Sequence, residues 1–140
     1  MSNETSKYVL DSFALLAYLT GEPGAQRVKQ VLKQSETGAC QVCISLINLG
    51  EVLYITERRR GLAAAQRVLA LTESLPLEIF AVTREQVLQA AHIKAQYALA
   101  YADAFAVACA QQKSAVILTG DPEFHSVESL VAVDWLPANP

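Results

Sequence analysis

The chain has 140 residues, of which 52% are hydrophobic, and its net charge is −3. This size is typical of one domain, so we expect residues 1–140 to form a single folding unit with loose ends at 1–6 and 137–140. The acidic balance does not favour tight nonspecific nucleic-acid binding. The polar N-terminus and the lack of an apolar run of about 18 residues predict a cytoplasmic protein with no membrane partner.

The first half of the chain alternates between strand-like and helical patterns. Thr20-Gly21 and Gly61 are typical helix-ending signals, and Glu22-Pro23 opens a new helix. In chain order, we predict a strand over 7–10, helices over 12–19 and 24–35, a strand over 41–45 and a helix over 46–60.

The second half continues the same alternation. Thr83, with Gln86 three residues later, is typical of a helix N-cap. We predict a helix over 62–75, a strand over 77–82, helices over 84–97 and 101–112, a strand over 115–119, a helical turn after Asp121-Pro122, and a strand over 130–133. Strands that alternate with helices imply an α/β fold with a parallel sheet covered on both faces.

The chain has three cysteines, and this odd number argues against a secreted disulfide framework. Cys40 and Cys43 match the C-x-x-C pattern of zinc and redox sites. They lie in or just before a predicted strand, however, where residues three apart point to opposite faces. This placement favours ordinary core residues.

Four acids stand in unusually apolar surroundings. Asp103 is the one charged residue of the run 98–110, and three others occupy similar contexts: Asp11, Glu51 and Asp121. A buried carboxylate is unfavourable by several kcal/mol unless something compensates it. Together the four acids predict a shared divalent-cation site.

The predicted topology permits these acids to meet. Asp11 and Asp121 follow strands, at the sheet edge where ligands bind in parallel sheets. Asp103 lies in the first turn of a helix, whose dipole would keep it ionised. Each acid also has a simpler interpretation, because Asp11 and Asp121 are good N-caps and Glu51 could face solvent.

A carboxylate cluster suits Mg²⁺ or Mn²⁺, which prefer oxygen ligands and promote phosphodiester hydrolysis. Polar neighbours could orient the acids by hydrogen bonds: Ser12, Ser45, Asn48 and Thr119. Candidate contacts to RNA phosphates or to a protein partner are Arg58, Arg59, Arg60 and Lys94. Arg84 is a further candidate for a phosphate contact, and His125 follows Asp121 closely enough to lie at the edge of a substrate groove.

Four segments, centred on Asp11, Asn48-x-x-Glu51, Ala102-Asp103-Ala104 and Thr119-x-Asp121-x-x-Phe124, closely resemble PIN-domain ribonucleases. More narrowly, they are similar to the toxins of VapBC-type toxin–antitoxin pairs. The resemblance implies a PIN-like α/β/α sandwich with a mainly parallel five-stranded sheet. It also implies Mg²⁺- or Mn²⁺-dependent endonucleolytic cleavage of RNA with Asp11, Glu51, Asp103 and Asp121 as the metal site, homodimerisation, and inhibition by a cognate antitoxin. Phe13 departs from the small polar residue common in relatives.

Two other classes of protein compete with this interpretation. A signalling receiver domain would need two adjacent acids after the first strand and a lysine at the end of the last strand. In this chain, Asp11 is followed by Ser12-Phe13 instead of a second acid. A catalytically inactive PIN-fold interaction module would keep the fold without the chemistry. The presence of all four acids favours the nuclease.

Overall fold

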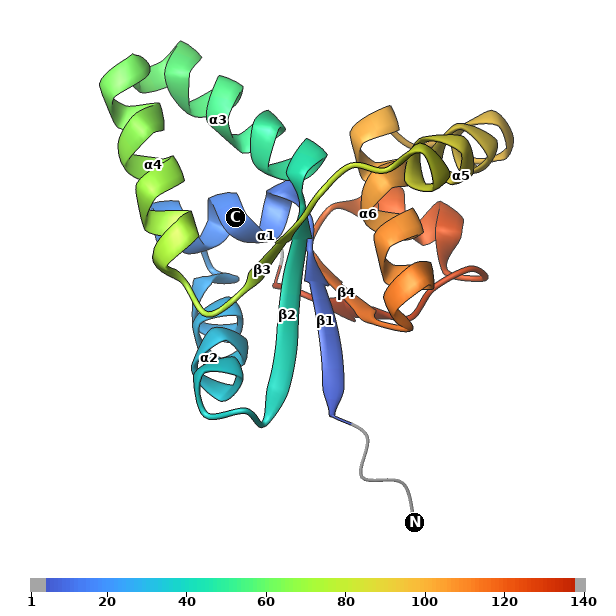
Figure 1. Ribbon diagram of the computed structural model, residues 1–140, viewed down its shortest axis with the longest axis horizontal. Coiled ribbons are helices and arrows are strands. Elements are labelled where there is room, and N and C mark those ends of the chain that lie inside the picture. Colours follow the sequence, from blue (N-terminus) through green and yellow to red (C-terminus); the bar gives the residue numbers. More distant parts are fainter. Residues whose placement is uncertain (1–4, 138–140) are drawn as a thin grey trace.

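The structure, a computed structural model, describes residues 5–137. Its centre is a sheet of five parallel strands in the order β3-β2-β1-β4-β5 (Figure 1). The strands are β1 (Ser6–Leu10), β2 (Cys40–Ser45), β3 (Glu78–Phe80), β4 (Val116–Thr119) and β5 (Val133–Trp135). The parallel sheet predicted from the alternating pattern is therefore confirmed, and so is the five-stranded sheet that the resemblance implies.

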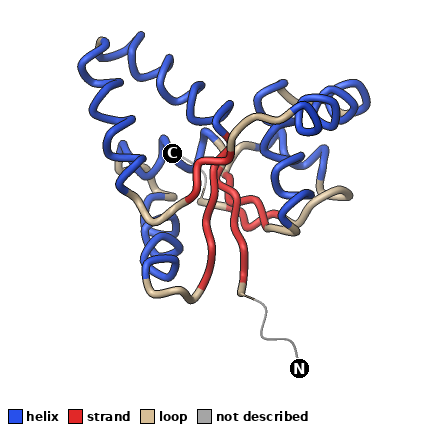
Figure 2. Tube along the Cα trace, viewed as in Figure 1, coloured by secondary structure: helices blue, strands red, loops and turns tan. Residues whose placement is uncertain are grey.

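Helices cover both faces of this sheet (Figure 2). One face carries α1 (Ser12–Thr20), α2 (Ala25–Glu36), α3 (Leu46–Arg60) and α4 (Leu62–Ser74). The other face carries α5 (Arg84–Gln96), α6 (Tyr101–Lys113) and the 3₁₀ helix η1 (Pro122–Val127). The predicted three-layer α/β/α sandwich is confirmed.

The strands divide their apolar side chains between two cores. Val9 of β1 and Ile117 of β4 face α5 and α6, whereas the next residues, Leu10 and Leu118, face α1 and α2. This alternation follows from the two-residue period of a strand. Both faces are apolar because a parallel sheet is covered on both sides.

Helix α6 lies deepest in the molecule. Its residues from Asp103 to Ala110 are all buried, and alanine occupies every second position of that stretch. Small side chains let the helix approach the sheet, α3 and α5 closely. The first turn of α6 therefore brings Asp103 to the interior near the carboxyl ends of the strands.

Two strand predictions need correction. The last strand spans 133–135 rather than 130–133, because the N–H groups of Leu130 and Val131 bond back to the carbonyl of Val127 and continue the turn after η1. The predicted strand over 77–82 contracts to β3, which pairs with the last three residues of β2. At the N-terminus, Ser6 pairs with Cys40 and so belongs to β1, although we expected it in a loose end. The predicted loose residues 1–4 and 138–140 lie outside the described part.

No helix within residues 5–137 is long and apolar enough to span a membrane.

Gly120 connects β4 to the site and packs against α1. A Cβ at this position would lie 2.7 Å from Cζ of Phe13, which overlaps the ring. Gly50, in the middle of α3, has no such neighbour within 4 Å. The absence of a side chain at Gly120 therefore lets the bulky Phe13 sit beside the backbone that leads into Asp121.

We expect Gly120→Ala to lower the free energy of unfolding by about 1–3 kcal/mol, because the added methyl group must displace the Phe13 ring. Gly50→Ala is the matched control and should raise stability by about 0.5–1 kcal/mol, since alanine favours the helix. Urea unfolding measures both changes. Phe13→Leu combined with Gly120→Ala should recover part of the loss. Equal urea midpoints for wild type and Gly120→Ala would contradict this account.

Candidate metal centre

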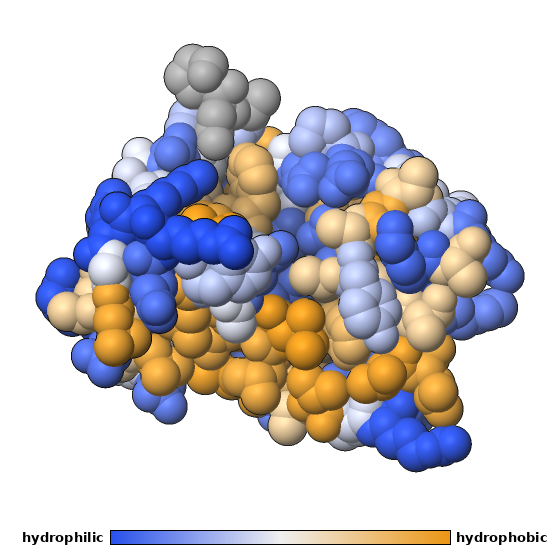
Figure 3. Space-filling view, turned by 90° about the horizontal axis from the view of Figure 1, so that it is seen from above, coloured by the Kyte–Doolittle hydropathy of each residue, from blue (hydrophilic) through white to orange (hydrophobic). Residues whose placement is uncertain are grey.

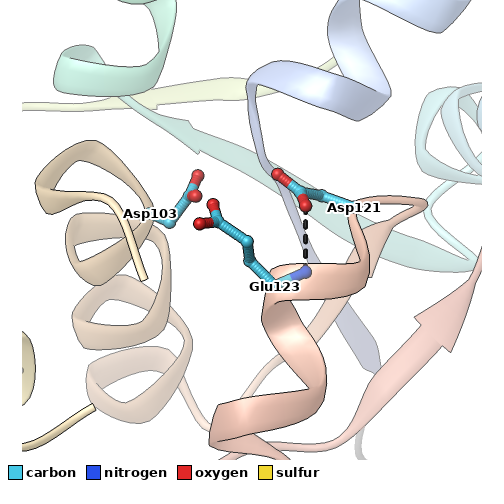
Figure 4. A group of neighbouring side chains, drawn as sticks. All are labelled: Asp103, Asp121 and Glu123. Carbon is cyan, nitrogen blue, oxygen red and sulfur yellow. Dashed lines mark hydrogen bonds between the residues drawn. The ribbon is translucent and has the colours of Figure 1, made fainter. Parts of the chain in front are cut away.

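Three carboxylates converge at the carboxyl end of the sheet. One oxygen each from Asp103, Asp121 and Glu123 lies within 4.8 Å of the others. Asp103 comes from α6, and the other two come from the start of η1 (Figure 4). Asp103 thus shares one small volume that is suited to a cation with two acids that follow it by 18 and 20 positions in the chain.

The strand order explains why Asp11 and Asp121 are close. Strands β1 and β4 are neighbours at the point where the sheet order reverses direction, and each is followed by one of these acids. Thr119, the last residue of β4, donates a hydrogen bond from Oγ1 to Asp11 Oδ2 and accepts one from Asp121 N at 3.0 Å. Thr119 therefore connects the two acids, as predicted for an orienting residue.

Asp11 and Asp121 also cap helices. Oδ1 of Asp11 accepts a hydrogen bond from Ala14 N at 2.9 Å, and Oδ1 of Asp121 accepts one from Glu123 N at 3.0 Å. The N-cap interpretation is thus correct for both residues. Capping does not exclude a metal role, because each carboxylate has two oxygens with about four lone-pair sites.

Asn48 joins three segments around the acids. Its Nδ2 donates to Ala102 O at 3.1 Å and to Ser12 Oγ at 3.3 Å, and Ser12 Oγ donates to Asn48 O at 3.2 Å. Asn48 is fully buried, and its Oδ1 has no hydrogen-bond partner among the described residues. Ser12 and Asn48 therefore hold the backbones beside Asp11 and Asp103 rather than the carboxylates themselves.

Ser45 has a different role from the one we predicted. Its Oγ accepts a hydrogen bond from Ile47 N at 3.2 Å and so caps α3. The residue is buried at the end of β2, and capping uses its hydroxyl locally. Ser45 thus fixes the start of the helix that carries Asn48 and Glu51, without orienting an acid directly.

Burial and mutual repulsion dominate the electrostatics of the cluster. Loss of solvation, and after it the charges of Asp11, Asp121, Glu51 and Glu123, together raise the pKa of Asp103 to about 8. Burial likewise raises the pKa of Asp11 to about 7, against the lowering effect of its hydrogen bonds. The expectation that the helix dipole keeps Asp103 ionised is therefore wrong for the metal-free protein. A helix dipole contributes only about 0.3–1 kcal/mol at an exposed site and is outweighed here.

Glu51 and Glu123 complete the acidic surroundings. Glu51 is half-buried on α3, close enough that its charge contributes to the raised pKa of Asp103, but it lies outside the trio. Glu123 is exposed and was absent from our predicted site. The sequence feature that could have indicated Glu123 is its position two residues after Asp121 in Asp-Pro-Glu. The N-cap at Asp121 turns Glu123 back toward the other acids.

The chemistry of this donor set fits a hard divalent cation. All the candidate ligand atoms are carboxylate oxygens. Within residues 5–137, none of the ion pairs involves any of the five acids of this region, which are Asp11, Glu51, Asp103, Asp121 and Glu123. Buried carboxylates without a cationic side chain are expected to be protonated or bound to a metal ion. Asp103, Asp121 and Glu123 are therefore the best-placed ligands, with Asp11 and Glu51 beside them.

The residues predicted to contact RNA or a protein partner are less directly connected to this site. Arg58 lies over the ring of Tyr54, with 5.2 Å between Cζ and the ring centroid. His125 stacks on Trp135 at 4.2 Å and pairs with Glu128, so other groups engage its ring. Lys94 and Arg84 are exposed on α5.

The amino-acid sequence of this chain matches the model of a known protein family. The model of the PIN domain matches residues 8–130. The chain belongs to the PIN domain family. A search of curated protein sequences gave no match.

Solved structures of toxin–antitoxin proteins share this PIN fold. VapBC2 from Rickettsia felis, bound to a DNA fragment of its promoter, is similar with a TM-score of 0.75 and 15% identity, covering 94% of this chain and 99% of that chain. The VapC20 toxin of Mycobacterium tuberculosis, described as cleaving the sarcin–ricin loop, is similar with a TM-score of 0.68 and 20% identity, covering 95% of this chain and 99% of that chain. VapBC from Salmonella typhimurium is similar with a TM-score of 0.71 and 18% identity, covering 93% of this chain and 98% of that chain. At these identities the similarity shows the fold.

The raised pKa values predict that the metal-free PIN domain loses stability as pH rises. Asp11 and Asp103 favour their protonated forms in the folded state. The stability that this preference contributes is complete below about pH 4 and is lost as the pH rises through 7 to 8. Asp103→Asn should therefore raise the metal-free Tm much more at pH 8.5 than at pH 5. Thermal unfolding in EDTA at both pH values measures the effect.

Mn²⁺ should restore stability to the wild type at pH 8.5 more than to Asp103→Asn, because binding requires the ionised acid. Glu85→Gln, at an exposed acid on α5, is the matched control and should behave as wild type. A strongly lowered Tm of metal-free Asp103→Asn at pH 8.5 would instead make Asp103 a structural residue.

Proposed function

We propose that this PIN domain is the toxin of a VapBC-type toxin–antitoxin pair, a metal-dependent endoribonuclease that acts on RNA in the cytoplasm. The observation that carries this proposal is the group of acids at the reversal point of the sheet, which have no cationic partner among residues 5–137. The likeness to the VapC20 toxin, which is described as cleaving the sarcin–ricin loop, supports this proposal.

In this proposal Asp103, Asp121 and Glu123 hold Mg²⁺, for which Mn²⁺ substitutes, with Asp11 and Glu51 beside them. A bound ion of this kind lowers the pKa of its water and offsets the charge that develops on the cleaved phosphate. Asp103 carries a proton near neutral pH in the metal-free state, so it must release that proton when the ion binds.

The surrounding residues keep the carboxylates in place. Thr119 holds Asp11 and the backbone of Asp121 at a fixed separation, and Asn48 holds α3 against the start of α6. Asn48 Oδ1, which lacks a partner among residues 5–137, is available to a water in the site. This rigid support matters because hydrolysis requires the ligands to be held before the substrate arrives.

The antitoxin partner is supported by a hollow between α1, α3 and α4. Its volume is about 270 Å³ and its lining combines apolar side chains with three arginines: Leu16, Leu19, Ile55, Val68, Leu71, Arg59, Arg60 and Arg67. An amphipathic, acidic antitoxin segment matches this lining in both polarity and charge. Arg59 and Arg60 thus have the protein-partner role in this proposal, whereas Arg58 lies over Tyr54.

Homodimerisation is supported by exposed apolar surface. Viewed from above, a band of hydrophobic residues runs along one side of the molecule, from the α3–α4 end toward the α5 end (Figure 3). The large hydrophobic residues exposed on these elements include Leu46, Leu62 and Leu88, at 45%, 57% and 52%. Such a continuous patch is typical of a protein–protein interface, and we propose a second copy as its partner.

We expect the purified chain to cleave a mixed RNA pool in Mn²⁺ or Mg²⁺ and not in EDTA. Asp103→Asn should lower the cleavage rate by about 100-fold or more, because it removes a ligand charge from the metal site. Glu123→Gln should lower it by about 10-fold, since this exposed acid is the most easily replaced by water. Gel analysis of RNA fragments measures all three rates.

Glu85→Gln is again the control and should cleave at the wild-type rate. Equal cleavage by Asp103→Asn and wild type would indicate a contaminating nuclease and contradict the assignment. Mn²⁺ binding without cleavage of the pool would restrict the substrate to an RNA absent from it. Loss of both activity and metal binding in the wild type would favour the inactive interaction module.

A further inference from the structure

The sequence pattern Cys40-x-x-Cys43 does not form a pair in the fold, but Cys43 has another cysteine partner. Cys40 faces the α2 side of the sheet, where its Sγ donates to Val31 O at 3.3 Å. Cys43 faces the α6 side, and its Sγ lies 3.6 Å from Sγ of Cys109. The two thiols that meet are therefore 66 residues apart in the chain.

This pair joins the sheet to the central helix. Cys43 is in β2, and Cys109 is in α6, six residues after Asp103 and thus about 9 Å along the helix from it. Both cysteines are free and buried, at 4% and 0% exposure. A disulfide requires the sulfurs to approach to about 2.05 Å, which is a closure of about 1.5 Å from their present separation.

A cavity gives small molecules a route to Cys43. It has a volume of about 590 Å³, and its lining includes both Cys40 and Cys43 together with Glu78 and Lys113. It lies at the amino ends of β1 and β2, away from the acids that follow the carboxyl ends of the strands. Lys113 pairs with Glu78 there, so a cationic group stands near the thiol.

The two thiols differ in acidity. The hydrogen bond with Cys109 and the charge of Lys113 lower the pKa of Cys43, against the raising effect of burial and of Glu78, whereas the same hydrogen bond and burial raise the pKa of Cys109. Either sulfur can donate in this contact, and Cys43 is the one that lines the cavity and so meets an oxidant first. A thiolate is the reactive form toward oxidants.

We propose that Cys43 and Cys109 are a peroxide-sensitive dithiol that closes to an intramolecular disulfide and fastens α6 to the sheet. Hydrogen peroxide is the oxidant. The Cys43 sulfur attacks a peroxide oxygen, the O–O bond breaks, and Cys43 becomes a sulfenic acid as one water leaves. The Cys109 sulfur then attacks Cys43 Sγ, the S–O bond breaks, and the thiol proton leaves with the hydroxide as the second water. Two thiols thus lose two electrons, and one peroxide becomes two waters.

The resulting bond would act on the element that carries Asp103. It closes a loop of more than 60 residues in the unfolded chain, so it lowers the entropy of that state substantially. The oxidised protein is then more resistant to unfolding, and α6 is held at its buried face. The inference stands on the thiol pair and the cavity, independently of the proposed nuclease activity.

The test treats the folded full chain with hydrogen peroxide, blocks remaining thiols with iodoacetamide under denaturing conditions, and maps the peptides by mass spectrometry. We expect a Cys43–Cys109 crosslink with a loss of two hydrogens, an alkylated Cys40, and a Tm about 5–10 °C above that of the reduced protein. Treatment in 8 M urea is the contrasting condition, under which the neighbours Cys40 and Cys43 should crosslink instead, because their loop is the shortest.

Cys40→Ser is the matched control, since it removes a cysteine from the same strand and should leave the crosslink and the Tm increase unchanged. Cys43→Ala and Cys109→Ala should each abolish both effects, and circular dichroism of the reduced variants checks that they fold. Three alkylated cysteines after treatment, a sulfinic acid without a crosslink, or a Cys40–Cys43 bond in the folded protein would each overturn the proposal. A Cys43–Cys109 crosslink that did not raise the Tm would overturn its stabilising role.

Discussion

The constraint that governs this protein is the repulsion among carboxylates that the fold holds together without a cationic partner. Burial and neighbouring acids raise the pKa of Asp103 to about 8, so the metal-free site stays compact by keeping protons. The fold thus stores an unfavourable arrangement at one end of the sheet. A cation that replaces those protons relieves the repulsion, which is why the same feature destabilises the apo chain and suits metal binding.

The rest of the architecture supports this arrangement from outside the cluster. The alanines of α6 let the helix sit deep enough to bury Asp103, and Gly120 leaves room for Phe13 beside the backbone leading to Asp121. Thr119 and Asn48 supply the hydrogen bonds that fix the separate segments. Asn48 contacts backbone and Ser12 and so positions the segments without touching a carboxylate, whereas Thr119 also donates to Asp11 and lowers its pKa in part.

The two ends of the sheet have separate chemistry. At the carboxyl end, hard oxygen donors favour Mg²⁺ or Mn²⁺, and at the amino end a cavity reaches the soft sulfur of Cys43. Helix α6 contributes to both, with Asp103 in its first turn and Cys109 two turns later. A covalent bond at Cys109 would therefore restrain the element that presents Asp103, and the close packing of α6 is the physical link between the two sites.

The sequence alone determined the α/β class and the position of nearly every element, and it predicted that four acids, Asp11, Glu51, Asp103 and Asp121, belong to one site. Periodicity, capping residues and isolated acids are local signals, and such signals survive in a single chain. Tertiary structure decided which groups meet. Glu123 turns into the cluster, Ser45 caps α3, the last strand moves to 133–135, and Cys43 pairs with Cys109 rather than Cys40. These outcomes depend on contacts between groups that the tertiary fold brings together. No short sequence pattern indicates such contacts when the groups are far apart in the chain.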